Sequence, residues 1–331
     1  MEKVVVAIAD VRAIDQLLAL PARYVHADKE WIITYPSDTY PIFSVSENRE
    51  VFAHDMLIQP RWNVLDQHPF NKRRKTWYLD RYDKINQNVH LENVLGMFGL
   101  QYYQPLPVSE INFDLPKVTY HFDSGYGKYV IKPTGGARSL GIIFVEEPIN
   151  LRELLAKMKP MLNNKDTTNE QYFELWHHFG LRYHKGEENR ENEMAKVLAD
   201  NTLVIQQMNP FDDVVEFRVI SGTDKPLMFA RDHLHAGKHN VFDTIVNEKS
   251  KLIDQEIYQE IMLVFSTGKL QTYGSHDIWY SAKGKCWGIY EYQTQYGHNH
   301  IPEQLHIEYM KDVIATAYSR LTGEVVFNSY N

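Results

Sequence analysis

Apolar residues along the chain gather in short runs rather than in long helical repeats. Runs rich in β-branched and aromatic residues, bounded by turn residues, predict β-strands at 4–9, 31–35, 42–45, 129–131, 142–145, 203–208, 215–220, 226–231, 275–280 and 287–293. Apolar residues at helical spacing predict helices over 11–20, 83–98 and 151–161. The mixture predicts an α+β or α/β protein in which residues 1–80 form a small α/β domain.

Polar residues dominate two segments that interrupt this pattern. Residues 163–200 are rich in charge and predict an exposed insertion, which we hypothesise to act as a lid or as a docking element for an acceptor. A basic run over 71–75 lies near the end of the first domain. Its two interpretations are a patch for nucleic acid or an acidic partner, and a solvated turn.

Composition narrows the class of protein. With 331 residues, 44% of them hydrophobic and 24% charged, the chain is expected to form two or three soluble packed units. Its net charge of −8 argues against binding nucleic acid through the overall field. Cys286 is the single cysteine, which excludes an intrachain disulfide and favours a cytoplasmic location. The first apolar run is expected to be a strand rather than a signal peptide, and no run reaches membrane-spanning length, so we expect no membrane partner.

A glycine-rich loop over 132–141 separates two of the predicted strands and reads Lys-Pro-Thr-Gly-Gly-Ala-Arg-Ser-Leu-Gly. Glycines allow backbone N–H groups to converge on an anion, and a lysine ammonium supplies the charge that phosphate favours. The loop lacks the Gly-Lys-Ser/Thr ending and the following helix of a P-loop. It is therefore either a flap over a polyphosphate or a plain surface hairpin.

Two acids mark the last pair of predicted strands. If these strands fold as a hairpin about Gly284, Asp277 and Glu291 face each other. Opposed carboxylates repel, and a divalent cation relieves the repulsion. The amide oxygen of Gln293, two residues along on the same face, completes the hard-oxygen set that Mg²⁺ takes beside nucleotide phosphates. The alternative is a pair of acids on a solvated face.

A further polar pair lies in the predicted strand 215–220. Alternation places Glu216 and Arg218 on one face of this strand. The pair is either an ion pair on the solvated side of the sheet or part of the lining of a cleft.

The order and spacing of these motifs resemble the ATP-grasp superfamily of carboxylate–amine ligases, over about residues 80–300. In that family a lysine opens a helix and a second lysine follows in an apolar-Lys-Pro strand before a flap, as Lys84 and Lys132 do here. Residues 131–141 resemble the flap of D-alanine–D-alanine ligases without a gap, and ribosomal-protein glutamate ligases belong to the same group. The hinge strand 204–209 with the following acid, and residues 291–297 in place of Glu-x-Asn-x-x-Pro-Gly, complete the resemblance.

Several positions depart from the family pattern. Gln206 stands where the hinge acid usually meets the adenine amino group, and Gln293 replaces the metal-binding asparagine. Tyr296 replaces the proline of the closing signature, and Arg138 enlarges the flap. Together these departures indicate a divergent member of the superfamily.

The resemblance implies an ATP-grasp fold in which two α+β subdomains, 81–208 and 209–331, follow the N-terminal domain. It implies ATP and two Mg²⁺ ions as cofactors. The implied nucleotide-binding residues are Lys84, Lys132, Gly135, Gly136, Ser139, Gly141, Gln206, Gln207, Met208, Asn209 and Glu216. The implied metal ligands are Asp277, Glu291 and Gln293. For a donor to a tetrahedral oxyanion, Arg231 is the first candidate and Arg218 the second, while Arg138 is placed to reach the acceptor.

The implied reaction joins a carboxylate to an amine through an acylphosphate, with a small molecule or a peptide as substrate. One alternative is a kinase or a nucleotide-binding module on the same fold that does not ligate. Another is a nucleic-acid-directed nucleotidyl ligase, but residues 132–138 lack the aspartate of its Lys-x-Asp-Gly-x-Arg pattern. The sequence identifies neither the substrates, nor the general base, nor an oligomeric state.

Overall fold

A computed structural model describes residues 1–9, 17, 19–34, 54–62, 70–81, 106–107, 126–133, 143–150, 153–154, 156, 203–207, 211–231, 242–266, 273–293 and 301–324. The chain divides into two compact units. Unit 1 combines Met1–Arg81 with Val214–Asn331, and unit 2 is Tyr82–Asp213. The mixed α and β composition predicted from the sequence is confirmed. The division into three domains stays a prediction.

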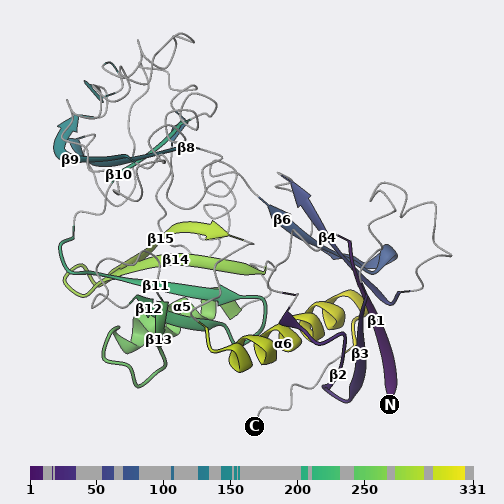
Figure 1. Cartoon of the computed structure of the whole chain (residues 1–331). Helices are drawn as coiled ribbons and strands as arrows, with labels where there is room; N and C mark the ends of the chain where they lie inside the picture. The colour runs from purple at the N-terminus through teal and green to yellow at the C-terminus, as the bar shows by residue number, and fades with distance from the viewer. Residues whose placement is uncertain are drawn as a thin grey trace, which may run out of the picture. The chain divides into compact units, whose positions relative to one another are not determined.

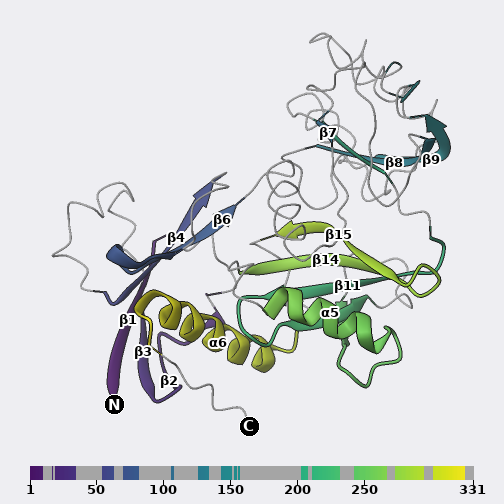
Figure 2. The same ribbon diagram turned by 180° about the vertical axis from the view of Figure 1, so that it is seen from behind.

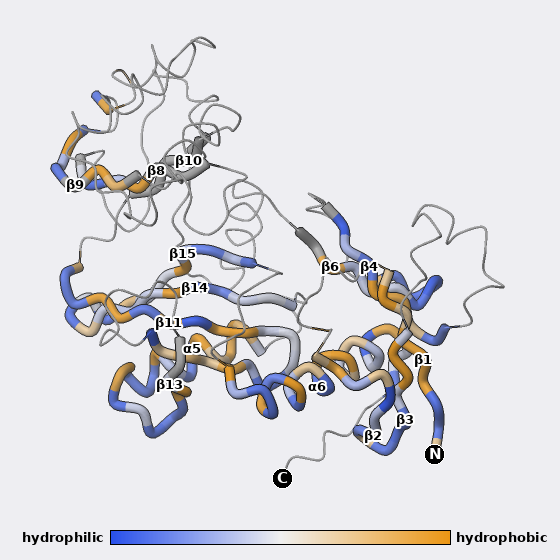
Figure 3. The backbone as a smooth tube through the Cα atoms, viewed as in Figure 1, coloured by the Kyte–Doolittle hydropathy of each residue, from blue (hydrophilic) through white to orange (hydrophobic). Residues whose placement is uncertain are grey.

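Unit 1 begins with a six-stranded sheet of order β2-β3-β1-β4-β6-β5 (Figure 1). Its strands are β1 (Glu2–Ile8), β2 (Arg23–His26), β3 (Lys29–Thr34), β4 (Met56–Trp62), β5 (Phe70–Asn71) and β6 (Thr76–Arg81). The four inner strands run parallel, and the short edge strands β2 and β5 run antiparallel to their neighbours. A strand covered on both sides is expected to be apolar over its length, and Figure 3 shows β1 as mainly hydrophobic.

The second sheet of unit 1 is antiparallel and has the order β13-β12-β11-β14-β15. Its strands are β11 (Val214–Ser221), β12 (Leu227–Arg231), β13 (Phe242–Ile245), β14 (Gly274–Ser281) and β15 (Cys286–Gln293). The helix α5 (Gln255–Ser266) covers one face, as Figure 2 shows. The ring of Phe265 on this helix lies 4.5 Å from His276 and 6.2 Å from Trp287, measured between ring centroids. The buried residues of this sheet face are Phe217, Val219, His276, Ile278, Tyr280, Trp287, Ile289 and Tyr292.

The helix α6 (Glu303–Thr322) joins the two sheets of unit 1 into one hydrophobic core (Figure 1). On the side of the first sheet, the rings of Trp31 and Tyr318 meet edge to face with centroids 5.5 Å apart. On the side of the second sheet, the Tyr309 hydroxyl donates a 2.7 Å hydrogen bond to the carbonyl of Ile220. The helix ends at Gly323, whose positive φ of 77° is the left-handed conformation that glycine adopts most easily.

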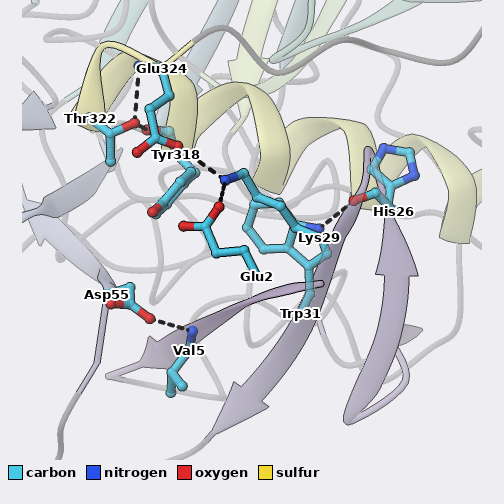
Figure 4. Close-up of polar contacts among 9 residues, drawn as sticks. All are labelled: Glu2, Val5, His26, Lys29, Trp31, Asp55, Tyr318, Thr322 and Glu324. Atoms are coloured by element: carbon cyan, nitrogen blue, oxygen red, sulfur yellow. Dashed lines mark hydrogen bonds and ion pairs between the residues drawn. The ribbon is translucent and has the colours of Figure 1, made fainter.

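Polar contacts fix the end of α6 against the first strands (Figure 4). The ammonium of Lys29 donates to the carboxylate of Glu2 and, at 3.1 Å, to that of Glu324. The indole N–H of Trp31 donates to the His26 carbonyl at 2.9 Å. These bonds tie residues from both ends of the sequence into one packed unit.

Unit 2 contains a four-stranded sheet of order β7-β10-β8-β9. Its strands are β7 (Leu106–Pro107), β8 (Tyr126–Pro133), β9 (Ile143–Asn150) and β10 (Leu203–Gln207). Strands β8 and β9 pair antiparallel, as expected for the two arms of the predicted hairpin. Strand β10 pairs antiparallel with both β8 and β7.

Most predicted strands are found within one or two residues of their expected bounds, while other elements were missed. The strands expected at 4–9, 31–35, 203–208, 215–220 and 226–231 correspond to β1, β3, β10, β11 and β12. The strand expected at 42–45 and the helices expected at 11–20, 83–98 and 151–161 lie wholly or mostly outside the described residues. The sequence did not predict β2, β4, β6, α5 or α6.

The basic run proves to be a short 3₁₀ turn, Lys72–Arg74, between β5 and β6. Lys75 closes it with a φ of 48°, and its N–H donates to the Lys72 carbonyl at 3.3 Å. All four basic residues of 72–75 are exposed. Within the described residues, no helix combines the length and apolar character needed to cross a bilayer.

Candidate active site

The face of the second sheet opposite α5 carries charged side chains from neighbouring strands. The register aligns Phe229, Arg218, Asp277 and Glu291 in one row across β12, β11, β14 and β15. The adjacent row aligns Glu216 on β11 with Trp279 on β14 and Gly288 on β15. We call these two rows the charged face.

An arginine and an aspartate form the centre of the charged face. The Nε of Arg218 donates to Oδ1 of Asp277 at 2.7 Å, and Nη2 donates to Oδ2 at 2.9 Å. Only 7% of the Arg218 side chain and 21% of the Asp277 side chain are exposed. Two parallel N–H···O bonds of this kind fix both the position and the plane of a carboxylate.

Glu216 forms the second ion pair of the charged face. Its carboxylate accepts a hydrogen bond from Nη1 of Arg231 on the neighbouring strand β12. These two side chains are more exposed than the first pair, at 30% for Glu216 and 27% for Arg231. Glu216 and Arg218 therefore share a strand face as predicted, but each pairs with a neighbouring strand rather than with the other.

The predicted opposition of Asp277 and Glu291 is confirmed by the strand register. The reason differs from the one expected, because the turn joins Ser281 to Cys286 and would by itself align Asp277 with Tyr290. The register shifts between Asp277 and Ile278, which leaves Tyr290 as an extra residue and brings Glu291 opposite Asp277. A bulge of this kind re-aims the side chains beyond it.

The turn itself also differs from expectation. Its left-handed residue is Lys285, with a φ of 46°, rather than Gly284. The Gly284 N–H instead donates to the Ser281 hydroxyl at 2.9 Å. The glycine that the hairpin requires is Gly288, where an added Cβ would lie 2.7 Å from the indole ring of Trp279. The indole therefore lies directly over the backbone of β15, within the charged face.

The donor set of the hairpin suits a divalent cation such as Mg²⁺. Asp277 and Glu291 are direct neighbours, and Gln293 lies opposite Ser275 two residues further along. A carboxylate has about four lone-pair sites, so the two bonds from Arg218 leave Asp277 with acceptor capacity. Within the described residues, no group of three or more His, Cys, Asp or Glu side chains gathers at one point. The assignment of Asp277, Glu291 and Gln293 as metal ligands therefore stays a prediction.

In unit 2, the backbone places two of the predicted nucleotide-binding segments on adjacent strands. Lys132 lies in β8 opposite Val204 of β10. Gln206, also in β10, lies opposite Val130, and Gln207 lies opposite Tyr129. The flap lysine and the hinge glutamines thus belong to the same sheet.

The remaining predicted residues lie outside the described part of the chain. They are Lys84, Gly135, Gly136, Arg138, Ser139, Gly141, Met208 and Asn209, together with the insertion 163–200. Sequence reasoning had missed both ion pairs of the charged face and the packing of Trp279 on Gly288. No signal in the sequence fixes the register between β11 and β14 that creates the first pair.

Comparison with known proteins gives structural likenesses only. No protein-family model matches the sequence, and no curated protein matches it. The chain is similar to a D-alanine–D-alanine ligase from Bacillus anthracis, with 12% identity, a TM-score of 0.48, and coverage of 98% of this chain and 100% of that one.

Two further likenesses are to a biotin carboxylase from Campylobacter jejuni and to the ATP-grasp ligase PsnB. The first has 10% identity and a TM-score of 0.44, and covers 95% of this chain and 70% of that one. The second was solved with the precursor peptide PsnA2 and AMPPNP. It has 12% identity and a TM-score of 0.34, and covers 72% of this chain and 62% of that one.

Proposed function

We propose that the protein is an ATP- and Mg²⁺-dependent ligase that joins a carboxylate to an amine through an acylphosphate. The observation that carries the proposal is the alignment of Asp277 with Glu291 on the charged face. The proposal is also supported by the order of the motifs along the chain: the glycine-rich loop 132–141, the hinge strand 204–209 and the hairpin that carries Asp277 and Glu291. We propose a reducing, cytoplasmic setting because the chain has a single cysteine.

Asp277, Glu291 and Gln293 are proposed to hold Mg²⁺. When bound, the cation would neutralise charge on the transferred phosphoryl group. Glu291 contributes a carboxylate from the edge strand, and Asp277 contributes one whose plane is fixed by Arg218.

Three groups of residues are proposed to bind the nucleotide. Lys84, Lys132 and the flap residues Gly135, Gly136, Ser139 and Gly141 would bind its phosphates. The backbone and amides of Gln206, Gln207, Met208 and Asn209 would bind the adenine. Glu216 would accept hydrogen bonds from the ribose, a role for which its pairing with Arg231 fixes the carboxylate.

The chemistry proceeds in two displacements. An oxygen of the substrate carboxylate attacks the γ-phosphorus, the bond to the β,γ-bridging oxygen breaks, and ADP leaves. The amine nitrogen then attacks the acyl carbon, the amine loses a proton, and phosphate leaves. Attack of the amine forms a tetrahedral oxyanion, which collapses when phosphate leaves and which needs a positively charged hydrogen-bond donor. The partly exposed Arg231 is our candidate for this donor. Arg138 is proposed to contact the acceptor.

Substrates are proposed to be small-molecule or peptide carboxylates and amines. The basic turn 72–75 does not lead us to propose a nucleic acid partner, because its exposed residues make a short solvated turn.

The test is a screen for ADP release over amino acids, short peptides, polyamines and other carboxylates, with product masses measured. We expect one carboxylate–amine pair to stimulate ADP release and to give a product lighter than the sum of its substrates by one water. Glu291→Gln should abolish this stimulation. Glu308→Gln, which makes the same change on α6, is the control and should retain it. A phosphorylated product without condensation would indicate that the protein is a kinase and not a ligase.

A further inference from the structure

We infer that Arg218 is a positioning residue for Asp277 that also sets how the acidic hairpin takes its cation. It holds the carboxylate in place and cancels its charge, so that the hairpin binds a divalent cation together with a polyphosphate in preference to the bare ion. The inference rests on the proposed function for the identity of the cation site. It assigns to Arg218 a role different from that of an oxyanion donor.

The geometry of Arg218 supports a fixed position. Two of its nitrogens donate to the two oxygens of one carboxylate, at 2.7 and 2.9 Å. The residue is 6% exposed. Its strand neighbours Phe217 and Val219 are fully buried on the opposite face, which anchors β11 against α5. A guanidinium held in this way orients Asp277 and has little freedom to swing toward a substrate.

The charge of the row supports the second part of the inference. Arg218 contributes one positive charge, and Asp277 and Glu291 contribute one negative charge each, so the three side chains sum to −1. Without Arg218 the two acids would sum to −2. A bare divalent cation is attracted less strongly by the actual row, whereas an anionic metal–nucleotide complex is repelled less strongly. Both effects favour the complex over the bare ion.

The size of the effect follows from Coulomb's law. At roughly 6 Å and with water-like screening, a unit positive charge weakens the binding of a divalent cation by about tenfold. Fixing the carboxylate acts separately, because groups that orient a metal ligand typically change metal affinity by about 10- to 100-fold. Charge and orientation can therefore be separated by two substitutions at one position.

The experiment measures Mn²⁺ binding to the full chain by electron paramagnetic resonance, with and without a non-hydrolysable ATP analogue. Arg218→Gln loses both the paired donors and the charge, so bare Mn²⁺ should bind it about tenfold tighter than it binds Arg218→Lys, which isolates the charge. Arg218→Lys keeps the charge and loses the paired donors, so bare Mn²⁺ and the Mn²⁺–analogue complex should both bind at least about tenfold more weakly than they bind the wild-type chain. Arg23→Gln removes a charge from an exposed ion pair on β2 and should change neither affinity.

The outcomes separate this inference from the proposed function. Glu291→Gln should abolish binding of the complex, and its failure to do so, or no Mn²⁺ binding by any variant, overturns both. If Glu291→Gln acts as expected but bare Mn²⁺ binds folded Arg218→Gln no tighter than it binds folded Arg218→Lys, only the role of the Arg218 charge is overturned. Should Arg218→Gln not fold, Arg218→Lys decides alone, because wild-type affinity for both forms of Mn²⁺ would refute the positioning role.

Discussion

The contact of Gly288 with Trp279 gives a prediction whose size follows from the structure. A Cβ at position 288 would lie 2.7 Å from three atoms of the indole ring, closer than such atoms approach one another. Overpacking of this kind costs about 1–3 kcal/mol, and the reduced freedom of alanine in the unfolded chain returns about 0.4–1 kcal/mol. We expect Gly288→Ala to lower the free energy of unfolding by about 1–2 kcal/mol.

A second part of this prediction is that shortening Trp279 should relieve the clash at position 288. Trp279→Leu alone should cost about 2–4 kcal/mol, because it leaves a cavity where the buried ring packs. In Gly288→Ala with Trp279→Leu, the new methyl group occupies space that the ring has left. The double variant should therefore be more stable than the sum of the single changes predicts, by about 1 kcal/mol.

Urea denaturation, followed by far-UV circular dichroism, measures all three variants. Gly323→Ala is a control of a different kind, because its Cβ meets nothing within 4 Å but its φ is 77°. It should cost about 1 kcal/mol through backbone strain and should not be rescued by Trp279→Leu. Additive effects of the changes at 279 and 288 would refute the steric reasoning.

Two further predictions concern groups near the contact of α6 with the first sheet. Burial raises the pKa of Tyr24, and its buried hydroxyl finds no hydrogen-bond partner within the described residues, so Tyr24→Phe should leave stability unchanged or raise it by up to about 1 kcal/mol at pH 7. Because the pKa of Tyr24 is higher in the folded chain than in the unfolded chain, folding stability is unaffected below the unfolded pKa near 10 and falls as the pH rises above it. Tyr24→Phe should therefore reduce the loss of stability at alkaline pH. Urea unfolding at pH 7 to 11 measures this loss. The hydrogen bond to Glu2 raises the pKa of Lys29, so the stabilisation that Lys29 provides is complete below about pH 10 and is lost at higher pH. Lys29→Met should therefore make the free energy of unfolding less dependent on pH above about pH 10. Lys3→Met, which removes the lysine of an exposed ion pair, is the control. An unchanged alkaline slope in either variant would contradict the corresponding assignment.

The strands of the charged face were predictable because each is an alternating run that ends in turn residues. The opposition of Asp277 and Glu291 followed from counting along one hairpin. The count succeeded although the turn was placed one residue out of register, because the bulge at Tyr290 supplied the missing residue. The local sequence pattern therefore predicted that the two acids face each other, but it did not predict the bulge that aligns them.

The partners of these acids were not predictable in the same way. Arg218 and Asp277 are 59 residues apart, and their pairing depends on the register between β11 and β14. No turn joins these strands directly, so no count along the chain fixes that register. The choice between a pair within one strand and pairs across strands had to come from the structure.

The helix α6 was missed for a different reason. Its buried positions include His306, Ala315 and Ala317 beside larger apolar residues, so they do not form a simple apolar stripe. The helix is buried between two sheets, and a helix covered on more than one side need not be amphipathic. Strand β4 was obscured by Pro60 and Arg61 near its end.

The central claim is that the protein activates a carboxylate with ATP, and hydroxylamine trapping tests it most directly. Hydroxylamine captures an acylphosphate as a hydroxamate, whatever the natural amine is. We predict that, with the carboxylate found in the ADP screen, the wild-type chain forms hydroxamate in proportion to the ADP released, and that Glu291→Gln forms none. ADP release without hydroxamate, or equal hydroxamate from both chains, would contradict the account.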